Sequence, residues 1–155
     1  QAGQLSGAIA NGGLFYNPYL LKPPRTRETG VGKKTRPDRK GRIILDSASL
    51  EEVRKALFGV VNEPGGTAHG AATPLATVAG KTGTAQVIAQ KIPGMKLTGK
   101  QGDHAWFIAY APAEKPQIAV AVLVEHGGHG GAAAAPIARK VIEEYLKNDG
   151  PPLGR

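Results

Sequence analysis

The sequence of 155 residues contains no cysteine. Thiol catalysis, disulfide bonds and cysteine-ligated zinc are therefore excluded, while the redox compartment stays open. No apolar run reaches the roughly 18 residues that a membrane span requires, and no signal peptide is visible. Serine is scarce, with only Ser6, Ser47 and Ser49. With 41% apolar residues, however, the chain is long enough for a packed domain or a large piece of one.

Positive charge is concentrated in one segment. Residues 22–42 contain nine of the 20 lysines and arginines but only two acidic residues, Glu28 and Asp38, so the rest of the chain is close to neutral. Proline and glycine are frequent in this segment and apolar periodicity is absent, which predicts a basic, mobile loop. A nucleic-acid arm is the alternative. Because no aromatic residue lies in the segment to stack on bases, we expect no nucleic-acid partner.

Apolar spacing and glycine define two helices in the first half of the chain. The opening helix should end at residues 11–13, Asn-Gly-Gly, because glycine accepts the left-handed backbone that closes a helix. Residues 14–21 should then be extended. Ser49 and Glu52 match a capping box, which predicts a second helix that starts there and continues to Asn62.

The second half of the chain has the pattern of short strands separated by turn residues. The expected strands span residues 77–87, 104–110 and 117–124, with a polar loop at 89–103. The third strand is apolar on both faces, which predicts a central or covered position. A last helix should follow Gly130 and Gly131 with Pro136 in its first turn, and the tail at 148–155 should fray. This order predicts an α+β fold in which an antiparallel sheet packs with helices.

The first of these strands carries Lys81, Thr82, Gly83 and Thr84. A lysine directed into a cleft supplies positive charge for an anionic substrate and for the proton chemistry of a neighbouring hydroxyl, and threonine hydroxyls can bind a carboxylate. Gly83 lets a peptide approach the strand, and the next backbone amide can donate to an oxyanion. The triplet by itself is weak, because a surface lysine followed by a turn has the same letters.

The four histidines raise the question of a metal site. His126 and His129 flank two glycines, while His69 and His104 lie elsewhere in the sequence. A metal site usually recruits a third ligand with regular support, and a glycine-rich run is typical of a turn between the last strand and the last helix. We therefore expect neither a metal nor a cofactor.

The motif strand resembles the Lys-Thr-Gly strand of serine penicillin-binding proteins and β-lactamases. Four further segments are similar to that family in the same order, at residues 8–13, 65–68, 106–112 and 125–138. The resemblance covers nearly the whole chain and is strongest to class B penicillin-binding proteins of the elongation type, the penicillin-binding protein 2 group. It implies that residues 1–155 are the C-terminal portion of a transpeptidase domain, cut from a larger protein.

The resemblance implies acyl transfer, in which a serine attacks the terminal bond of a peptidoglycan stem peptide and an amine of a second stem resolves the acyl-enzyme. By the matching motif, Lys81 would assist proton transfer, Thr82 and Thr84 would bind the substrate carboxylate beside Gly83, and the Thr84 amide would donate to the oxyanion. The implied partners are stem peptides, β-lactams and a membrane glycosyltransferase of the elongation machinery. The implied location is the periplasmic face of the inner membrane, with an anchor outside this chain.

The serine motifs of the family are missing from this chain. Ser-x-x-Lys would need a lysine three positions after a serine, but those positions hold Ile9, Leu50 and Glu52. Ser-x-Asn is also absent, because the positions two after each serine hold Ala8, Ser49 and Glu51. We therefore expect the nucleophile on an upstream part of the same protein, and we predict that this chain alone forms no penicillin adduct. A separate binding module that uses residues 22–42 and a β-lactamase-like hydrolase fragment stay open as alternatives.

Overall fold

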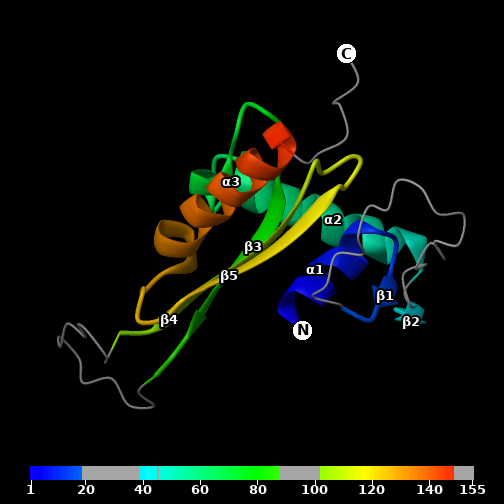
Figure 1. Cartoon of the computed structure of the whole chain (residues 1–155), viewed down its shortest axis with the longest axis horizontal. Coiled ribbons are helices and arrows are strands. Elements are labelled where there is room, and N and C mark those ends of the chain that lie inside the picture. Colours follow the sequence, from blue (N-terminus) through cyan, green and yellow to red (C-terminus); the bar gives the residue numbers. More distant parts are fainter. Residues whose placement is uncertain (19–38, 45, 88–101, 149–155) are drawn as a thin grey trace, which may run out of the picture.

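The structure, a computed structural model, describes residues 1–18, 39–44, 46–87 and 102–148. Its elements in chain order are α1 (Ala2–Ala10), β1 (Leu14–Tyr16), β2 (Arg39–Arg42), α2 (Ser47–Asn62), the short 3-10 helix η1 (His69–Ala71), β3 (Ala79–Ala85), β4 (His104–Ala111), β5 (Ile118–Val124) and α3 (Gly130–Asn148). β3, β4 and β5 form an antiparallel sheet in that order, and β1 pairs with β2. The predicted α+β fold is confirmed (Figure 1).

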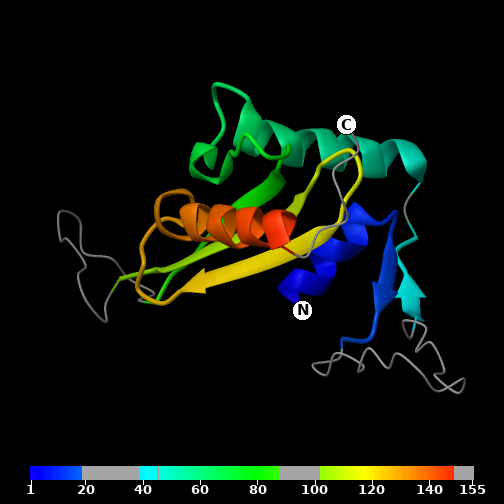
Figure 2. The ribbon, with the colours of Figure 1, turned by 45° about the horizontal axis from the view of Figure 1, so that its top comes forward.

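Helices lie on both faces of the three-stranded sheet (Figure 2). α3 packs along β4 and β5 on the face that carries Val120, and α2 packs against β3. α1 approaches β5 on the opposite face, where Ala119 and Ala121 point. A Cβ on Gly3 or Gly7 of α1 would lie 3.8 Å from the nearest alanine Cβ of β5, which is an ordinary van der Waals distance, so α1 and β5 pack in direct contact there.

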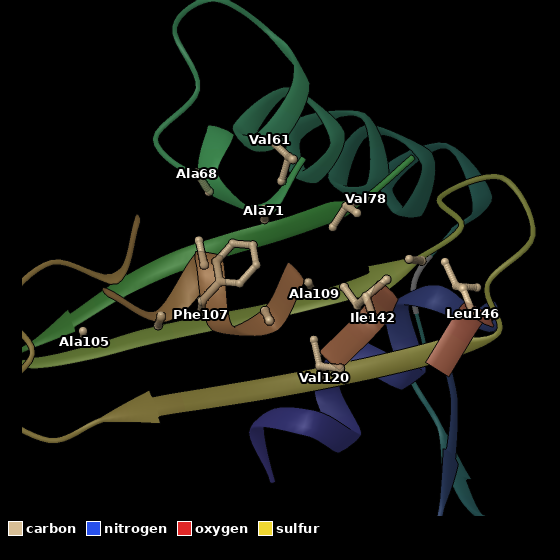
Figure 3. Packing of buried hydrophobic residues seen from close by; sticks show 14 residues of the cluster. Val61, Ala68, Ala71, Val78, Ala105, Phe107, Ala109, Val120, Ile142 and Leu146 are labelled. Atoms are coloured by element: carbon tan, nitrogen blue, oxygen red, sulfur yellow. The ribbon is translucent and has the colours of Figure 1, made fainter. Parts of the chain in front are cut away.

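The main core lies between α3 and the sheet (Figure 3). Ala105, Phe107 and Ala109 alternate along β4 and are fully buried, and Ile142 of α3 meets them from above. Of the two neighbouring aromatic residues on β4, Phe107 is therefore core, while Trp106 on the other face is half-buried. Replacing the Phe107 side chain with alanine should destabilise the fold by about 3–5 kcal/mol.

The strands occur where they were predicted, with small shifts at their ends. β3 is shorter than predicted and β4 runs on to Ala111, just before Pro112. The third strand is not central, because β4 occupies the middle of the described sheet. Of the alternative, a covered strand, β5 has α3 on one face and α1 on the other, although Ala119, Ala121 and Leu123 stay exposed. The alternating alanine and valine residues of β5 are compatible with a buried or a half-exposed strand, so the sequence pattern could not distinguish an inner from an outer position in the sheet. Of the predicted loop at 89–103, all but the last two residues lie outside the described residues.

α2 begins two residues earlier than the capping box predicted. Its N-cap is Asp46, whose carboxylate accepts the Ser49 backbone amide at 2.8 Å and the Ser49 hydroxyl at 2.6 Å. These hydrogen bonds, the hydroxyl bond foremost, hold the pKa of the Asp46 carboxyl below its usual range. Glu52 instead accepts a hydrogen bond from Lys55 at 2.9 Å. The predicted capping box is therefore wrong, because a second capping residue, Asp46, lies three positions before Ser49 and its carboxylate offers two acceptor oxygens.

The other two helices agree with the prediction at one end each. α1 ends at Ala10, and the two glycines that follow have φ of 85° and 95°, as predicted for a helix end. α3 begins at Gly130, so Pro136 lies in its second turn rather than its first. Asn148 is the last residue of α3 and not part of a frayed tail, while residues 149–155 lie outside the described residues.

Only the end of the basic segment lies in the described part of the chain. Arg39–Arg42 form β2, which is fully exposed and pairs with β1, so the prediction of a loop is wrong for these residues. Residues 19–38, and with them most of the predicted basic loop and the end of the predicted extended segment at 14–21, lie outside the described residues. No helix in the described ranges is both long and apolar enough to span a bilayer.

Candidate functional site

The Lys-Thr-Gly motif lies within β3, as predicted, and β3 is an outer strand of the described sheet. The four motif residues pair in register with β4, Lys81 with Ile108, Thr82 with Phe107, Gly83 with Trp106 and Thr84 with Ala105. The Lys81 side chain is exposed, and its Nζ donates to the Thr82 carbonyl oxygen at 2.9 Å. The strand therefore presents its ammonium group at the outer edge of the sheet.

The backbone of Thr84 is directed toward that outer edge. In an antiparallel ladder a residue points both its N–H and its C=O either at the partner strand or away from it. The Thr82 carbonyl accepts from Lys81, which favours the outward direction for Thr82 and hence for Thr84, two residues on. The backbone nitrogen of Gly83 and the carbonyl oxygen of Trp106 also lie near each other, since a Cβ built on Gly130 would lie 3.1 Å from the first and 2.1 Å from the second. This favours a Gly83 backbone that faces β4, and hence a Thr84 backbone that faces outward. Both observations place the Thr84 amide on the side where a second strand or a peptide would add.

Beside Lys81, a groove of about 640 Å³ separates α2 from β3. Its lining includes Lys81, Thr67 and the ion pair of Glu52 with Lys55. The hydrogen bond to Glu52 raises the pKa of the Lys55 ammonium group above its usual value. Among the described residues Lys81 forms no ion pair, and its Nζ donates to a backbone carbonyl oxygen instead.

Thr67 joins the site from the segment between α2 and η1. Its hydroxyl lies 3.0 Å from the Thr82 hydroxyl, which brings together side chains 15 positions apart. The chain reaches this position through Gly66, where a Cβ would lie 2.4 Å from the Val60 carbonyl oxygen, and through the Ala68 amide, which donates to the same oxygen at 2.9 Å. Sequence reasoning missed Thr67 as a site residue. The Gly-Gly that precedes it was the available signal, since paired glycines often mark a close backbone approach.

The start of α3 supports the motif strand from the face opposite Lys81. A Cβ on Gly130 would lie 2.8 Å from Gly83 O, and a Cβ on Gly131 would lie 2.0 Å from Thr67 O. Real Cβ atoms do not approach backbone oxygen that closely. Only glycine therefore lets the first turn of α3 sit between the motif strand and the Thr67 segment.

The serines of the chain are engaged elsewhere. Ser6 is 2% exposed and donates to the Ala109 carbonyl oxygen at 2.8 Å, so it ties α1 to the sheet. Ser49 donates to the cap of α2, and Ser47 occupies the exposed first position of the same helix. None of the three lies in the groove that Lys81 lines.

The histidines form a pair and two single sites. The His126 amide donates to His104 Nδ1 at 3.0 Å, and their ring centroids are 4.8 Å apart. His69 Nδ1 lies 3.0 Å from the Val61 carbonyl oxygen, and His129 is exposed. Within residues 1–18, 39–44, 46–87 and 102–148, no group of three or more His, Cys, Asp or Glu side chains could hold a metal ion.

Comparisons with known proteins agree with this geometry. The chain is 36% identical over 150 residues to the peptidoglycan D,D-transpeptidase MrdA of Acinetobacter baumannii, a match that covers 94% of this chain and 22% of that protein. Among solved structures, PBP2 of Pseudomonas aeruginosa in complex with WCK 5153 matches 95% of this chain and 30% of its own, with a TM-score of 0.71 and 34% identity. Penicillin-binding protein A of Mycobacterium tuberculosis, solved as an imipenem acyl-enzyme complex, matches 93% of this chain and 29% of its own, with a TM-score of 0.66 and 33% identity.

The chain therefore spans less than a third of each of these relatives. A family model described as the penicillin-binding protein transpeptidase domain matches residues 1–143, which is most of the chain. The matched range includes α1, the motif strand, the central sheet and most of α3. This chain belongs to the penicillin-binding protein transpeptidase family.

Proposed function

We propose that this chain is the C-terminal portion of the transpeptidase domain of a peptidoglycan D,D-transpeptidase, and that it forms one wall of the active-site cleft. The observation that carries the proposal is Lys81 at the outer edge of β3, beside a groove that also holds Thr67. The family relationship supports a serine acyl-enzyme mechanism, and the relative solved as an imipenem acyl-enzyme supports covalent reaction with β-lactams.

In this proposal, each motif residue has a separate task. The Lys81 ammonium group lowers the cost of moving a proton from a neighbouring serine hydroxyl, because positive charge favours the ionised form of that group. The Thr82 and Thr84 hydroxyls bind the substrate carboxylate, and the hydrogen bond between the Thr67 and Thr82 hydroxyls holds the Thr82 hydroxyl in place. Gly83 keeps the strand open to an extended peptide, and the Thr84 amide donates to the oxyanion.

The remaining parts of the reaction belong to protein outside this chain. We infer that an upstream part of the same protein supplies the serine nucleophile with its Ser-x-x-Lys motif and the Ser-x-Asn motif, because no serine here has either spacing. Stem peptides and β-lactams are the proposed substrates, and a membrane glycosyltransferase of the elongation machinery is the proposed partner. The proposed location is the periplasmic face of the inner membrane, since crosslinking acts on peptidoglycan outside the cytoplasm.

Labelling with a fluorescent penicillin tests the proposal. The intact protein should carry a label that survives denaturation, whereas residues 1–155 alone should carry none. In the intact protein, Lys81→Met should slow acylation by about 10²-fold or more, because proton transfer loses its charged partner. Lys115→Met, at the turn between β4 and β5, removes a lysine of equal charge and should leave the rate unchanged.

Two results would contradict this assignment. A stable label on residues 1–155 alone would show that a nucleophile lies within this chain. Rapid release of hydrolysed drug by the intact protein, in place of a lasting adduct, would instead assign it to the β-lactamase-like hydrolases.

Replacing Thr84 with proline tests the oxyanion contact separately. Proline lacks the amide hydrogen and is tolerated on an edge strand where that hydrogen points away from the ladder. Thr84→Pro should therefore leave the sheet folded while acylation by penicillin falls about 10²–10³-fold below the rate of Thr84→Val, which loses the same hydroxyl but keeps the amide hydrogen. A Thr84→Pro protein that loses its fold would show that this amide bonds β4 instead, and a folded one with an unchanged rate would show that it does not face the oxyanion.

A further inference from the structure

The turn between β5 and α3 is fastened to the start of β4 by two histidines. The His126 backbone amide donates to His104 Nδ1 at 3.0 Å, and the His126 Nδ1 lies 3.0 Å from the Gly102 carbonyl oxygen. A third hydrogen bond runs from the Gly128 amide to the Asp103 carbonyl oxygen at 2.8 Å. His126 itself has a positive φ of 54°, which is uncommon outside glycine, although asparagine, aspartate and histidine adopt it more often than other residues. We call this set of three hydrogen bonds the histidine clamp.

The donors and acceptors of the clamp define the protonation of both rings. A backbone amide only donates, so His104 Nδ1 must be unprotonated and its ring proton must lie on Nε2. A carbonyl oxygen only accepts, so His126 Nδ1 carries a proton, and it does so in both the neutral and the charged ring. Charging His104 would place a proton on Nδ1 and abolish its bond to the His126 amide. The clamp is therefore complete only while His104 is neutral.

The clamp lies next to the contacts that support the motif strand. Gly128 is two residues from Gly130, the first residue of α3, whose Cα fits against Gly83 with no room for a Cβ. His104 itself pairs with Ala85 at the end of β3. The position of the turn thus decides how the first turn of α3 meets the Lys-Thr-Gly strand.

We propose that His104 is a positioning residue for the Lys-Thr-Gly strand: neutral His104 holds the β5–α3 turn, and with it the start of α3, against Gly83. Protonation of His104 releases the turn and loosens this support. The proposal rests on the proposed function of β3, because it concerns how that strand is held for acylation.

Charged residues lie on each of the described segments that adjoin His104. Asp103 directly precedes β4, and Glu125 belongs to the turn that packs against His104. The Lys81 side chain lies on the same face of the sheet as His104, but the pair of Lys81 with Ile108 is four pairs along the ladder from the pair of Ala85 with His104. The His126 ring lies next to the His104 ring, so a charge on His126 would lie beside it directly. Because histidine changes charge between about pH 5 and 8, the clamp is expected to open toward the acidic end of that range.

Nuclear magnetic resonance of the intact protein labelled with ¹⁵N-histidine tests the geometry directly. At neutral pH the His104 ring should be protonated on Nε2 only, and the His126 amide signal should shift as His104 becomes charged. A proton on His104 Nδ1 at neutral pH would overturn the proposal, because the ring nitrogen could not then accept the amide.

The acylation rate of the intact protein by fluorescent penicillin between about pH 5.5 and 7.5 tests the consequence. His104→Asn retains an acceptor oxygen near the position of Nδ1 but does not titrate. At the acidic end of the range its acylation rate should therefore exceed that of the wild type by about three- to tenfold, while the two rates agree at neutral pH. His104→Ala removes the acceptor and should be slower by a similar factor at every pH. His129→Asn removes an exposed histidine from the same turn and should keep the wild-type profile.

The outcomes separate this proposal from the proposed function. Acylation with superimposable pH profiles for wild type and His104→Asn would overturn the positioning role alone. An intact protein that is not acylated at any pH would overturn the proposed function. In that case the tautomer of the His104 ring, measured by nuclear magnetic resonance, would still show whether the clamp forms. Urea unfolding of each variant checks that a slower rate does not arise from loss of fold.

Discussion

Replacing Gly130 with alanine is the most direct test of how α3 supports the motif strand. The added Cβ would lie 2.1 Å from Trp106 O, 2.8 Å from Gly83 O and 3.1 Å from Gly83 N. All three are backbone atoms of paired strands, so none can rotate away as a flexible side chain would. Either the start of α3 or the edge of the sheet must move.

The size of the effect follows from two opposing contributions. Overpacking a tight contact usually costs about 1–3 kcal/mol, and a contact this short against backbone oxygen belongs at the upper limit. Alanine is favoured over glycine within a helix by up to about 1 kcal/mol, which offsets part of the loss. We therefore expect Gly130→Ala to lower the free energy of unfolding by about 2 kcal/mol, which is the cost of overpacking reduced by the gain in helix propensity. In the intact protein, a displacement of Gly83 by about 1 Å would slow acylation by up to about 10²-fold.

Urea denaturation of residues 1–155 measures the first effect, and penicillin labelling of the intact protein measures the second. Gly65→Ala is the matched control, because a Cβ there meets no atom within 4 Å and the residue is exposed. Its free energy of unfolding should change by no more than about 0.5 kcal/mol. If Gly130→Ala were as stable and as fast as Gly65→Ala, the close contact between α3 and β3 would be refuted.

Three further substitutions test contacts away from the motif. Arg54→Met removes two hydrogen bonds to the last carbonyls of α1, at 2.9 and 3.1 Å, and should cost about 1–3 kcal/mol in urea unfolding. Its control, Lys55→Met, breaks only an exposed ion pair and should leave the unfolding midpoint close to that of the wild type. Ser6→Ala should cost about 1 kcal/mol, since it leaves a buried carbonyl without its hydroxyl donor. The lowered pKa of Asp46 means that its bonds to Ser49 stabilise the fold above the unfolded pKa and are lost as the pH falls through the folded pKa. Asp46→Asn should therefore reduce the dependence of stability on pH below about 4, and an unchanged dependence would show that this cap contributes nothing.

The sheet and the motif strand could be predicted from the sequence because their signals are local. Alternating apolar residues and bounding turn residues mark β4 without reference to any other segment. The helix start at Asp46 was missed for an equally local reason, since Ser49 also has a capping side chain and the sequence does not show which oxygen accepts which amide. β5 was misplaced in the sheet because strand order depends on pairing partners, and its own residues fit an outer or an inner position.

The contacts that complete the site could not be predicted, because they join segments far apart in the sequence. Thr67 meets Thr82 across 15 positions, and His104 meets His126 across 22. Neither pair has a spacing that belongs to a helix or a strand, so no periodicity indicates it. Only the turn connections on either side, brought together by the sheet, place these side chains within hydrogen-bond distance.

The glycines explain why the family was nevertheless recognisable from short segments. Gly66, Gly130 and Gly131 each lie where a Cβ would come within 2.4 Å of a backbone oxygen, and together they bring α2, β3 and α3 into contact around the motif. A segment that must be glycine for steric reasons has the same letters wherever the same backbone contact is built. Residues 65–68 and 125–138 are similar to the family for that reason, although they carry none of the side chains proposed to touch substrate. The likeness in these two segments thus concerns how α2, β3 and α3 pack together, and the proposed chemistry of Lys81 depends on that packing to hold the strand in place.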